Sequence, residues 1–180
     1  ITNRLVGSEM CIRDRDGGFN GGPVDIMIIL EAFGAGLIVE PYIPNIVLSG
    51  NLVSKLGNKE QKEAILPNLL SGDMQLAFAF SEPQSRFDLN DVTTLAEKKG
   101  SDFKLNGFKS VVMNGPAADK LIISARTAGS QLDENGISLF IVDRETKGVS
   151  LRDYSNIDGS KASELTLEDV VLTKDALLGE

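Results

Sequence analysis

The 180-residue sequence has no histidine, no tryptophan and only one cysteine, Cys11. Without histidine the chain cannot build a His-based catalytic triad or a histidine-ligated zinc site. A single cysteine cannot form an internal disulfide, which is typical of proteins kept in a reducing compartment. We therefore expect a cytoplasmic protein without a metal site.

Long apolar runs are lacking as well. The run 26–30 is far shorter than the roughly 20 residues that cross a bilayer as a helix, and Glu31 follows it directly. We expect no membrane insertion. The formal net charge of −8 disfavours nucleic-acid binding, because the phosphate backbone is recognised by basic surfaces. A polyanionic ligand would need a local basic patch, or one supplied by another chain.

Helical patterns dominate the first part of the chain. Apolar spacing predicts a helix over 24–39 and a second helix over 43–56. Asn58, with Gln61 three residues later, forms a capping-box pattern and so predicts the start of a third helix. Together these segments predict an antiparallel helical part over residues 17–73, with short connections.

The first sixteen residues share no apolar period with the predicted helices. Two interpretations stay open: a foreign leader, such as translated adaptor sequence, or a native N-terminal turn of unusual composition. On the first interpretation we expect residues 1–16 to lack core contacts. Deep burial of Leu5, Met10 and Ile12 together would favour the second.

After Gly72 the pattern changes to short strands separated by turn residues, at a spacing of roughly 8–12 residues. Such a series predicts a barrel or a sandwich over residues 74–180, and therefore an α+β fold for the whole chain. The predicted strands are 76–81, 92–98, 103–105, 111–113, 121–125, 137–142, 149–151 and 164–172.

One of these strands leads into a polar segment. The apolar run 76–80 is followed at once by Ser81, Glu82 and Pro83, and then by a turn that contains Arg86. A junction of strand and loop is a common ligand site, because the strand fixes the backbone and the loop supplies exposed polar groups. The alternative is an ordinary strand followed by a proline-containing turn.

Six segments of the chain, in the same order, resemble the acyl-CoA dehydrogenase family. Residues 77–83 (AFAFSEP) are similar to the family's flavin-contacting strand and loop. Residues 106–115 (NGFKSVVMNG) resemble its second flavin element, NG-x-K-x-W-I-T-N-G. The helical segment 57–67 resembles G-(S/T)-x-x-Q-K-x-x-x-L-P. The other three segments are 121–126, 136–142 and 165–172, and the resemblance runs from Gly22 to Glu180.

The resemblance implies an architecture and an activity. We expect a truncated N-terminal helical part and a β-barrel-like middle domain, with the family's C-terminal helical bundle missing. The implied activity is FAD-dependent α,β-desaturation of an acyl-CoA thioester in fatty acid metabolism. As a fragment the chain is expected to be inactive, and at full length to form homo- or hetero-oligomers.

The resemblance also implies a site. The implied cofactor-binding residues are Phe78, Phe80, Ser81, Val111, Val112 and Met113. The backbone of Phe80 and Ser81, with the Ser81 hydroxyl, is expected to donate to the pyrimidine side of the flavin, where negative charge accumulates on reduction. The segment 111–113 is expected to lie on a neighbouring strand and to contact the ring. We expect these segments to line one concavity, with the implied substrate-binding residues Arg86 and Phe87 at its rim.

Some positions depart from the family pattern. Val111 and Met113 stand where the family usually has tryptophan and a hydroxyl residue, so Met113 offers only its backbone N–H. The loop 84–87 replaces a glycine- and serine-containing loop and resembles the pimeloyl-CoA dehydrogenase small-subunit branch. Arg86 there would meet the terminal carboxylate of a dicarboxylic acyl chain. Alternatively, Arg86 pairs with a neighbouring carboxylate, Asp88 or Asp91, at the surface.

We assign no catalytic residue in this sequence. Glu82 occupies a position that is structural in the family, where the base comes from the C-terminal bundle. The leading interpretation is therefore a fragment of an FAD-dependent acyl-CoA dehydrogenase. The alternative is a non-catalytic partner subunit of a hetero-oligomeric dehydrogenase. A stand-alone β-domain with an unrelated ligand is disfavoured by the helical segment 57–67.

Overall fold

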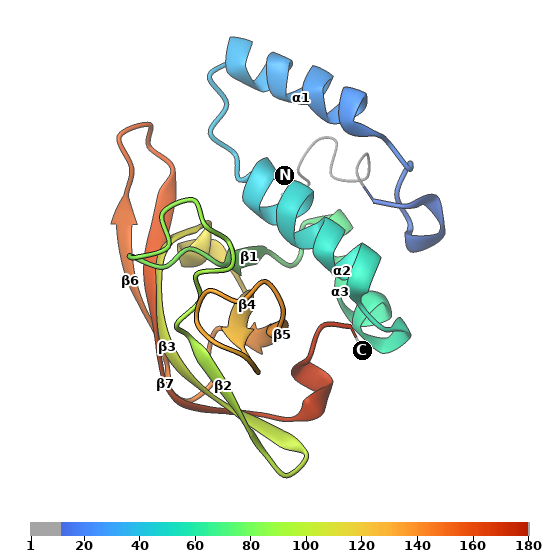
Figure 1. The fold of residues 1–180 in the computed structure, drawn as a ribbon. Coiled ribbons are helices and arrows are strands. Elements are labelled where there is room, and N and C mark those ends of the chain that lie inside the picture. Colours follow the sequence, from blue (N-terminus) through green and yellow to red (C-terminus); the bar gives the residue numbers. More distant parts are fainter. Residues whose placement is uncertain (1–11, 180) are drawn as a thin grey trace.

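The computed structural model describes residues 12–179, which form a helical layer and a curled sheet (Figure 1). Within these residues helices precede Gly72 and strands follow it, as the sequence predicts. The helices are α1 (Pro23–Ala35), a π-helical segment (Ile43–Gly50) that runs into α2 (Asn51–Leu56), and α3 (Lys59–Ser71). Short 3₁₀ turns lie at Asp14–Asp16, Gly115–Ala117 and Lys174–Ala176.

The start of α3 has the predicted capping box. The Asn58 side chain accepts a hydrogen bond from the Gln61 N–H at 2.8 Å, and the Gln61 side chain accepts one from the Asn58 N–H at 3.1 Å. The Gln61 amide also donates to the carbonyls of Asp175 and Leu177. This one side chain therefore caps its helix and joins the helical layer to the end of the described chain.

The strands form one mixed sheet that curls into a half-barrel. Its order is β1-β4-β2-β3-β7-β6, and β5 pairs with β4. β1 runs parallel to β4, whereas β3 pairs antiparallel with both β2 and β7. The strands are β1 (Leu76–Ala79), β2 (Leu95–Lys99), β3 (Asp102–Met113), β4 (Lys120–Arg126), β5 (Ile137–Asp143), β6 (Val149–Ser155) and β7 (Lys161–Leu172).

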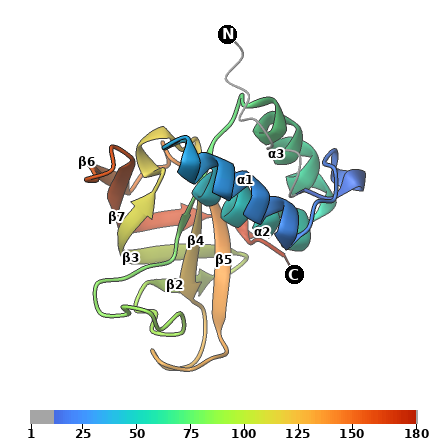
Figure 2. The ribbon, with the colours of Figure 1, turned by 90° about the horizontal axis from the view of Figure 1, so that it is seen from above.

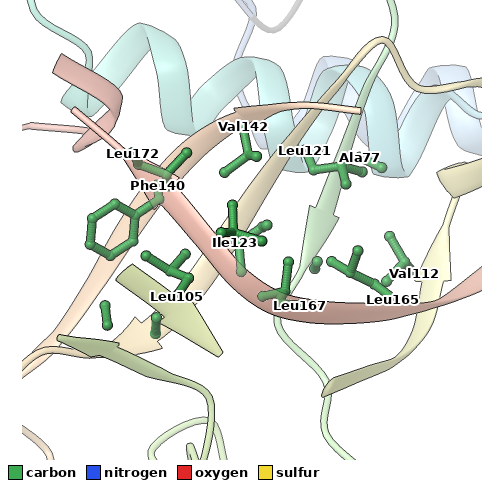
Figure 3. Close-up of a cluster of buried hydrophobic side chains, with 14 of the residues drawn as sticks. Ala77, Leu105, Val112, Leu121, Ile123, Phe140, Val142, Leu165, Leu167 and Leu172 are labelled. Carbon is green, nitrogen blue, oxygen red and sulfur yellow. The ribbon is translucent and has the colours of Figure 1, made fainter. Parts of the chain in front are cut away.

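Two apolar cores hold these layers together. The first fills the half-barrel (Figure 3), and the second lies between the helices and the outer face of β1 and β4 (Figure 2). Strand β1 serves both cores, because Ala77 and Ala79 enter the half-barrel while Leu76 packs against the helices. The alternation fixes which β1 side chains face away from the half-barrel: Leu76, Phe78 and, by continuation, Phe80.

The described part of the N-terminal segment makes one core contact, contrary to the prediction. Ile12 is fully buried in the helical core. Arg13 donates to the Ser54 hydroxyl at 3.2 Å, and that hydroxyl donates to Asp16 at 2.8 Å. The expectation of missing core contacts is thus wrong at Ile12, because one apolar side chain needs no helical period to fill a gap, whereas Asp14 and Arg15 are exposed. Leu5 and Met10 lie outside the described residues.

Helix α1 differs from the other helices in having no buried residue. Val24, Met27 and Ile28 are each more than half exposed, so α1 presents apolar side chains to solvent. No helix within residues 12–179 is both long and apolar enough to cross a membrane.

Candidate functional site

The two predicted cofactor segments lie side by side. The Ser110 N–H donates to the Ser81 carbonyl at 2.9 Å, and the Asn114 side chain donates to the Leu76 carbonyl at 3.1 Å. The end of β3 therefore runs antiparallel to β1, with one hydrogen bond at each end of the contact. The two segments are brought together as the sequence predicts, although β1 and β3 are not neighbours along the sheet order.

A β-bulge shapes the end of β3. The register between β3 and β7 shifts between Lys109 and Val112, and Val111 has a φ of 46°. A β-branched residue is strained in this left-handed region. The extra residue turns the Val112 side chain into the half-barrel (Figure 3), where it is fully buried. Val112 thus offers a ligand its backbone and no side chain, whereas Val111 is 51% exposed and Met113 44%.

We expect Val111→Gly to raise the free energy of unfolding by about 1 kcal/mol, because glycine adopts a positive φ without strain. The matched control is Val171→Gly, at an exposed valine of β7 that has no positive φ. That control should lower the stability by about 1 kcal/mol. Denaturant unfolding measures both, and a loss of similar size in both variants would show that Val111 stores no strain.

The outer face of these segments combines apolar side chains with one hydroxyl group. The rings of Phe78 and Phe80 lie in tilted contact, with a centroid distance of 4.9 Å. Val111 and Met113 add exposed apolar surface. The Ser81 hydroxyl has one described partner, the Ser110 hydroxyl, at a long 3.4 Å, and therefore keeps hydrogen-bonding capacity for a ligand.

Glu82 and Lys109 form a buried ion pair directly behind this face. Both side chains are fully buried, and Lys109 Nζ lies 2.7 Å from Glu82 Oε1. The same oxygen accepts from the Thr94 N–H and hydroxyl, at 3.0 and 2.7 Å. The second oxygen accepts from the Thr93 N–H and Gln84, each at 2.8 Å, and from the Thr93 hydroxyl.

This environment sets the protonation of Glu82. Burial alone would raise the pKa of its carboxyl, but the hydrogen bonds from Lys109, Thr93, Thr94 and Gln84 outweigh it and lower the pKa to about 2. A buried carboxylate with six donors has no free position for a substrate proton. Glu82 therefore organises the loop and is not a base.

The lowered pKa of Glu82 predicts a pH dependence. The unfolded carboxyl binds a proton near its ordinary pKa of 4.5, whereas the folded one binds it only near about 2. The pair's stabilisation is thus complete above about pH 5 and is lost as the pH falls towards 2. We expect the stability gap between the wild type and Glu82→Gln to shrink across this range, as followed by denaturant unfolding. A constant gap would contradict the lowered pKa.

Two further contacts surround the ion pair. Lys109 Nζ donates to the Ser124 hydroxyl of β4 at 3.0 Å. A side chain at Gly107, whose φ is 157°, would lie 2.7 Å from Thr94 Cα, so only glycine permits this approach of β3. The ion pair therefore ties β3, β4 and the loops around β1 into one unit.

Arg86 and Phe87 lie in an exposed turn instead of at the rim of a described cavity. Phe87 is 97% exposed, and Arg86 has a φ of 47°. Among residues 12–179 Arg86 makes no ion pair, so the predicted surface pair with Asp88 or Asp91 does not form. Asp91 instead accepts hydrogen bonds from two glutamines.

A cavity of about 620 Å³ opens beside Met113. Its wall combines Leu30 and Phe33 of α1, the segment 38–44, Gln75 and the β6–β7 turn at 158–161. Its volume is in the range of small-molecule sites. The sequence pattern did not indicate residues 38–44 and 158–161, since nothing local shows that a hairpin turn meets a helix connection. No group of three or more acidic or cysteine side chains suited to a metal ion occurs within the described residues.

The chain resembles known proteins along most of its length. Residues 77–170 match the acyl-CoA dehydrogenase middle domain, and residues 8–73 match the acyl-CoA dehydrogenase N-terminal domain. An acyl-CoA dehydrogenase of Bacillus subtilis is 39% identical over 133 residues, which cover 72% of this chain and 35% of that protein.

Solved structures show the same similarity. A glutaryl-CoA dehydrogenase from Mycobacterium smegmatis, in complex with FADH2, is 33% identical with a TM-score of 0.65, over 73% of this chain and 33% of that one. The ChsE4-ChsE5 complex from Mycobacterium tuberculosis is 25% identical with a TM-score of 0.85, over 96% of this chain and 45% of that one. The chain thus spans less than half the length of these proteins.

Proposed function

Because the chain belongs to the acyl-CoA dehydrogenase family, we propose that it is the flavin-binding part of an FAD-dependent dehydrogenase that desaturates acyl-CoA thioesters. The observation that carries this proposal is the pair of hydrogen bonds that joins the segment 76–81 to the end of β3 and so brings two flavin-type segments together. The FADH2 complex of the Mycobacterium smegmatis relative supports the choice of cofactor.

The residues of this face have distinct roles. Phe78, Phe80, Val111 and Met113 supply apolar contact and exclude water from one side of the ring. The Ser81 hydroxyl donates to the ring edge that becomes electron-rich on reduction. When bound, FAD supplies the hydride acceptor, and the protein supplies placement and electrostatics.

We assign the acyl group to the cavity beside Met113. That residue belongs both to the flavin face and to the cavity wall, so a thioester there would lie next to the ring. Apolar residues of α1 and of the segment 38–44 line much of the cavity and suit an acyl chain. Neither Arg86 nor Phe87 lines this cavity. Contacts from these two residues to the substrate therefore stay a prediction.

The α-proton requires a base, and Glu82 does not serve because its carboxylate is fully engaged; we infer that the base comes from outside this chain. General-base catalysis contributes about 10²–10⁴-fold. We therefore expect the 180-residue chain, mixed with FAD and short-, medium- or dicarboxylic acyl-CoAs, to leave the flavin absorbance unbleached. Bleaching by any thioester would show that the chain carries its own base.

A non-catalytic partner subunit is the second candidate. It is favoured by Val111 and Met113, which offer a flavin no polar side chain, and by the occurrence of a similar fold in the ChsE4-ChsE5 complex. The full-length protein separates the two candidates: purification with stoichiometric flavin supports the dehydrogenase, and purification without flavin supports the partner subunit.

A further inference from the structure

We propose that the Glu82–Lys109 ion pair is a positioning device that sets the register between β1 and β3 and keeps the wall behind the flavin face electrically neutral. The second half of this inference rests on the proposed function, whereas the first half concerns the protein alone. Neither residue touches the exposed face, so both act through their neighbours.

The inference that the pair sets the register rests on its position in the two segments. Glu82 directly follows Ser81, and Lys109 directly precedes Ser110. The Ser110 N–H donates to the Ser81 carbonyl at 2.9 Å. In this antiparallel arrangement the ion pair joins the next two residues that face each other, with a distance of 2.7 Å between Lys109 Nζ and Glu82 Oε1. The two contacts together fix how far the segments overlap and how far apart they lie.

The β-bulge makes this control necessary. Around Val111 the ladder between β3 and β7 is interrupted, so β3 receives less guidance from that side. A slip by one residue would exchange the buried Val112 with the exposed Val111 or Met113. The ion pair fixes β3 on one side of the bulge, at Lys109. The hydrogen bond from the Asn114 side chain fixes β3 on the other side.

The inference that the pair keeps the wall electrically neutral rests on the burial of both charges. Each side chain is fully buried, and a lone charge in such surroundings acts more strongly on its neighbours than one in water. A single carboxylate beside Ser81 would oppose negative charge on a nearby ring, and a single ammonium would favour it. As a pair the two charges cancel.

A purely structural role gives different expectations. Buried ion pairs are weak evidence for stability, because desolvation offsets much of the attraction. If the pair contributed only to global stability, removing either partner would speed amide exchange equally throughout the domain, and any effect on a flavin would have the same sign in both variants. The two roles are therefore distinguishable by the sign and the location of the effects.

The first test needs no flavin. We compare amide hydrogen exchange in the full 180-residue chain with that in Glu82→Gln, Lys109→Met and the double variant, which has neither charge but keeps a side-chain oxygen at residue 82. The Ser110 amide reports the register, and the Ile122 amide, in the middle of β4 between β1 and β5, reports global opening. We expect Ser110 to exchange at least about tenfold faster relative to Ile122 in each single variant. Equal acceleration of both amides would overturn the positioning role.

The second test measures the ratio of affinities for reduced and oxidised FAD, between about pH 6 and pH 8. We expect Glu82→Gln to raise this ratio and Lys109→Met to lower it, each by roughly tenfold, and the double variant to return near the wild type. The control is Glu164→Gln, which removes the ion pair between Glu164 and the exposed Arg152. This variant should leave the affinity ratio unchanged. Shifts of one sign in both single variants would overturn the neutrality argument.

Failure of the two proposals is separable. If the wild-type chain and the full-length protein bind neither form of FAD, the proposed function and the neutrality argument both fail. The exchange measurement still decides the positioning role in that case.

Discussion

Lys109→Met is expected to lower the free energy of unfolding at neutral pH by about 3–5 kcal/mol, because the Glu82 carboxylate remains buried without its counter-ion. The five other hydrogen bonds to Glu82 hold the carboxylate in place and so preserve the penalty. Denaturant unfolding measures the loss, provided that the m value, the dependence of the unfolding free energy on denaturant concentration, is the same in both proteins.

Two comparisons make the Lys109 result specific. The double variant Glu82→Gln with Lys109→Met should recover much of the loss, because it leaves no unpaired charge. The exposed pair of Lys59 and Glu63 on α3 offers a control, and Lys59→Met should change the stability by less than about 0.5 kcal/mol. A loss of under about 1 kcal/mol for Lys109→Met would contradict the buried-pair account.

The second large effect is expected at Arg126. Its side chain is only 4% exposed, and its guanidinium donates at 2.7–2.9 Å to four backbone carbonyls, those of Asn90, Gln131, Asp133 and Asn135. Arg126→Met would remove the arginine donor from all four carbonyls, of which Gln131 keeps the Val92 N–H at 3.2 Å, and would release the loops on either side. We expect a loss of about 3 kcal/mol, since hydrogen bonds to charged groups contribute more than neutral ones.

The matched control is Arg152→Met, which removes an exposed arginine from β6 whose one ion pair within residues 12–179 is with Glu164. That variant should change the stability by less than about 0.5 kcal/mol. Equal losses in the two variants would show that the loops hold their conformation without Arg126.

Most helices and strands follow from local patterns, although the strands predicted at 103–105 and 111–113 form the single strand β3 and the helix predicted over 24–39 ends at Ala35. The capping box of Asn58 and Gln61 predicts the start of α3 correctly, because its chemistry lies within four residues. The alternation of Ala77 and Ala79 with Phe78 likewise gives the two faces of β1. These features need no information from distant parts of the chain.

The features that sequence reasoning missed depend on distant contacts. The direction of Val112 follows from a bulge against β7, and no pattern within 111–113 shows that extra residue. The cavity wall joins residues from both ends of the chain. Ile12 was misjudged because its burial depends on helices that lie far along the sequence.

The central claim is that FAD binds on the outer face formed by β1 and the end of β3. The most direct measurement is an NMR titration of the isotope-labelled 180-residue chain with FAD, which detects even weak binding residue by residue. We predict that amide shifts concentrate at 78–82 and 110–114, and that Ser81→Ala and Phe80→Ala reduce them. Shifts that concentrate elsewhere, for example at the exposed α1 or the β6–β7 turn alone, would contradict the account.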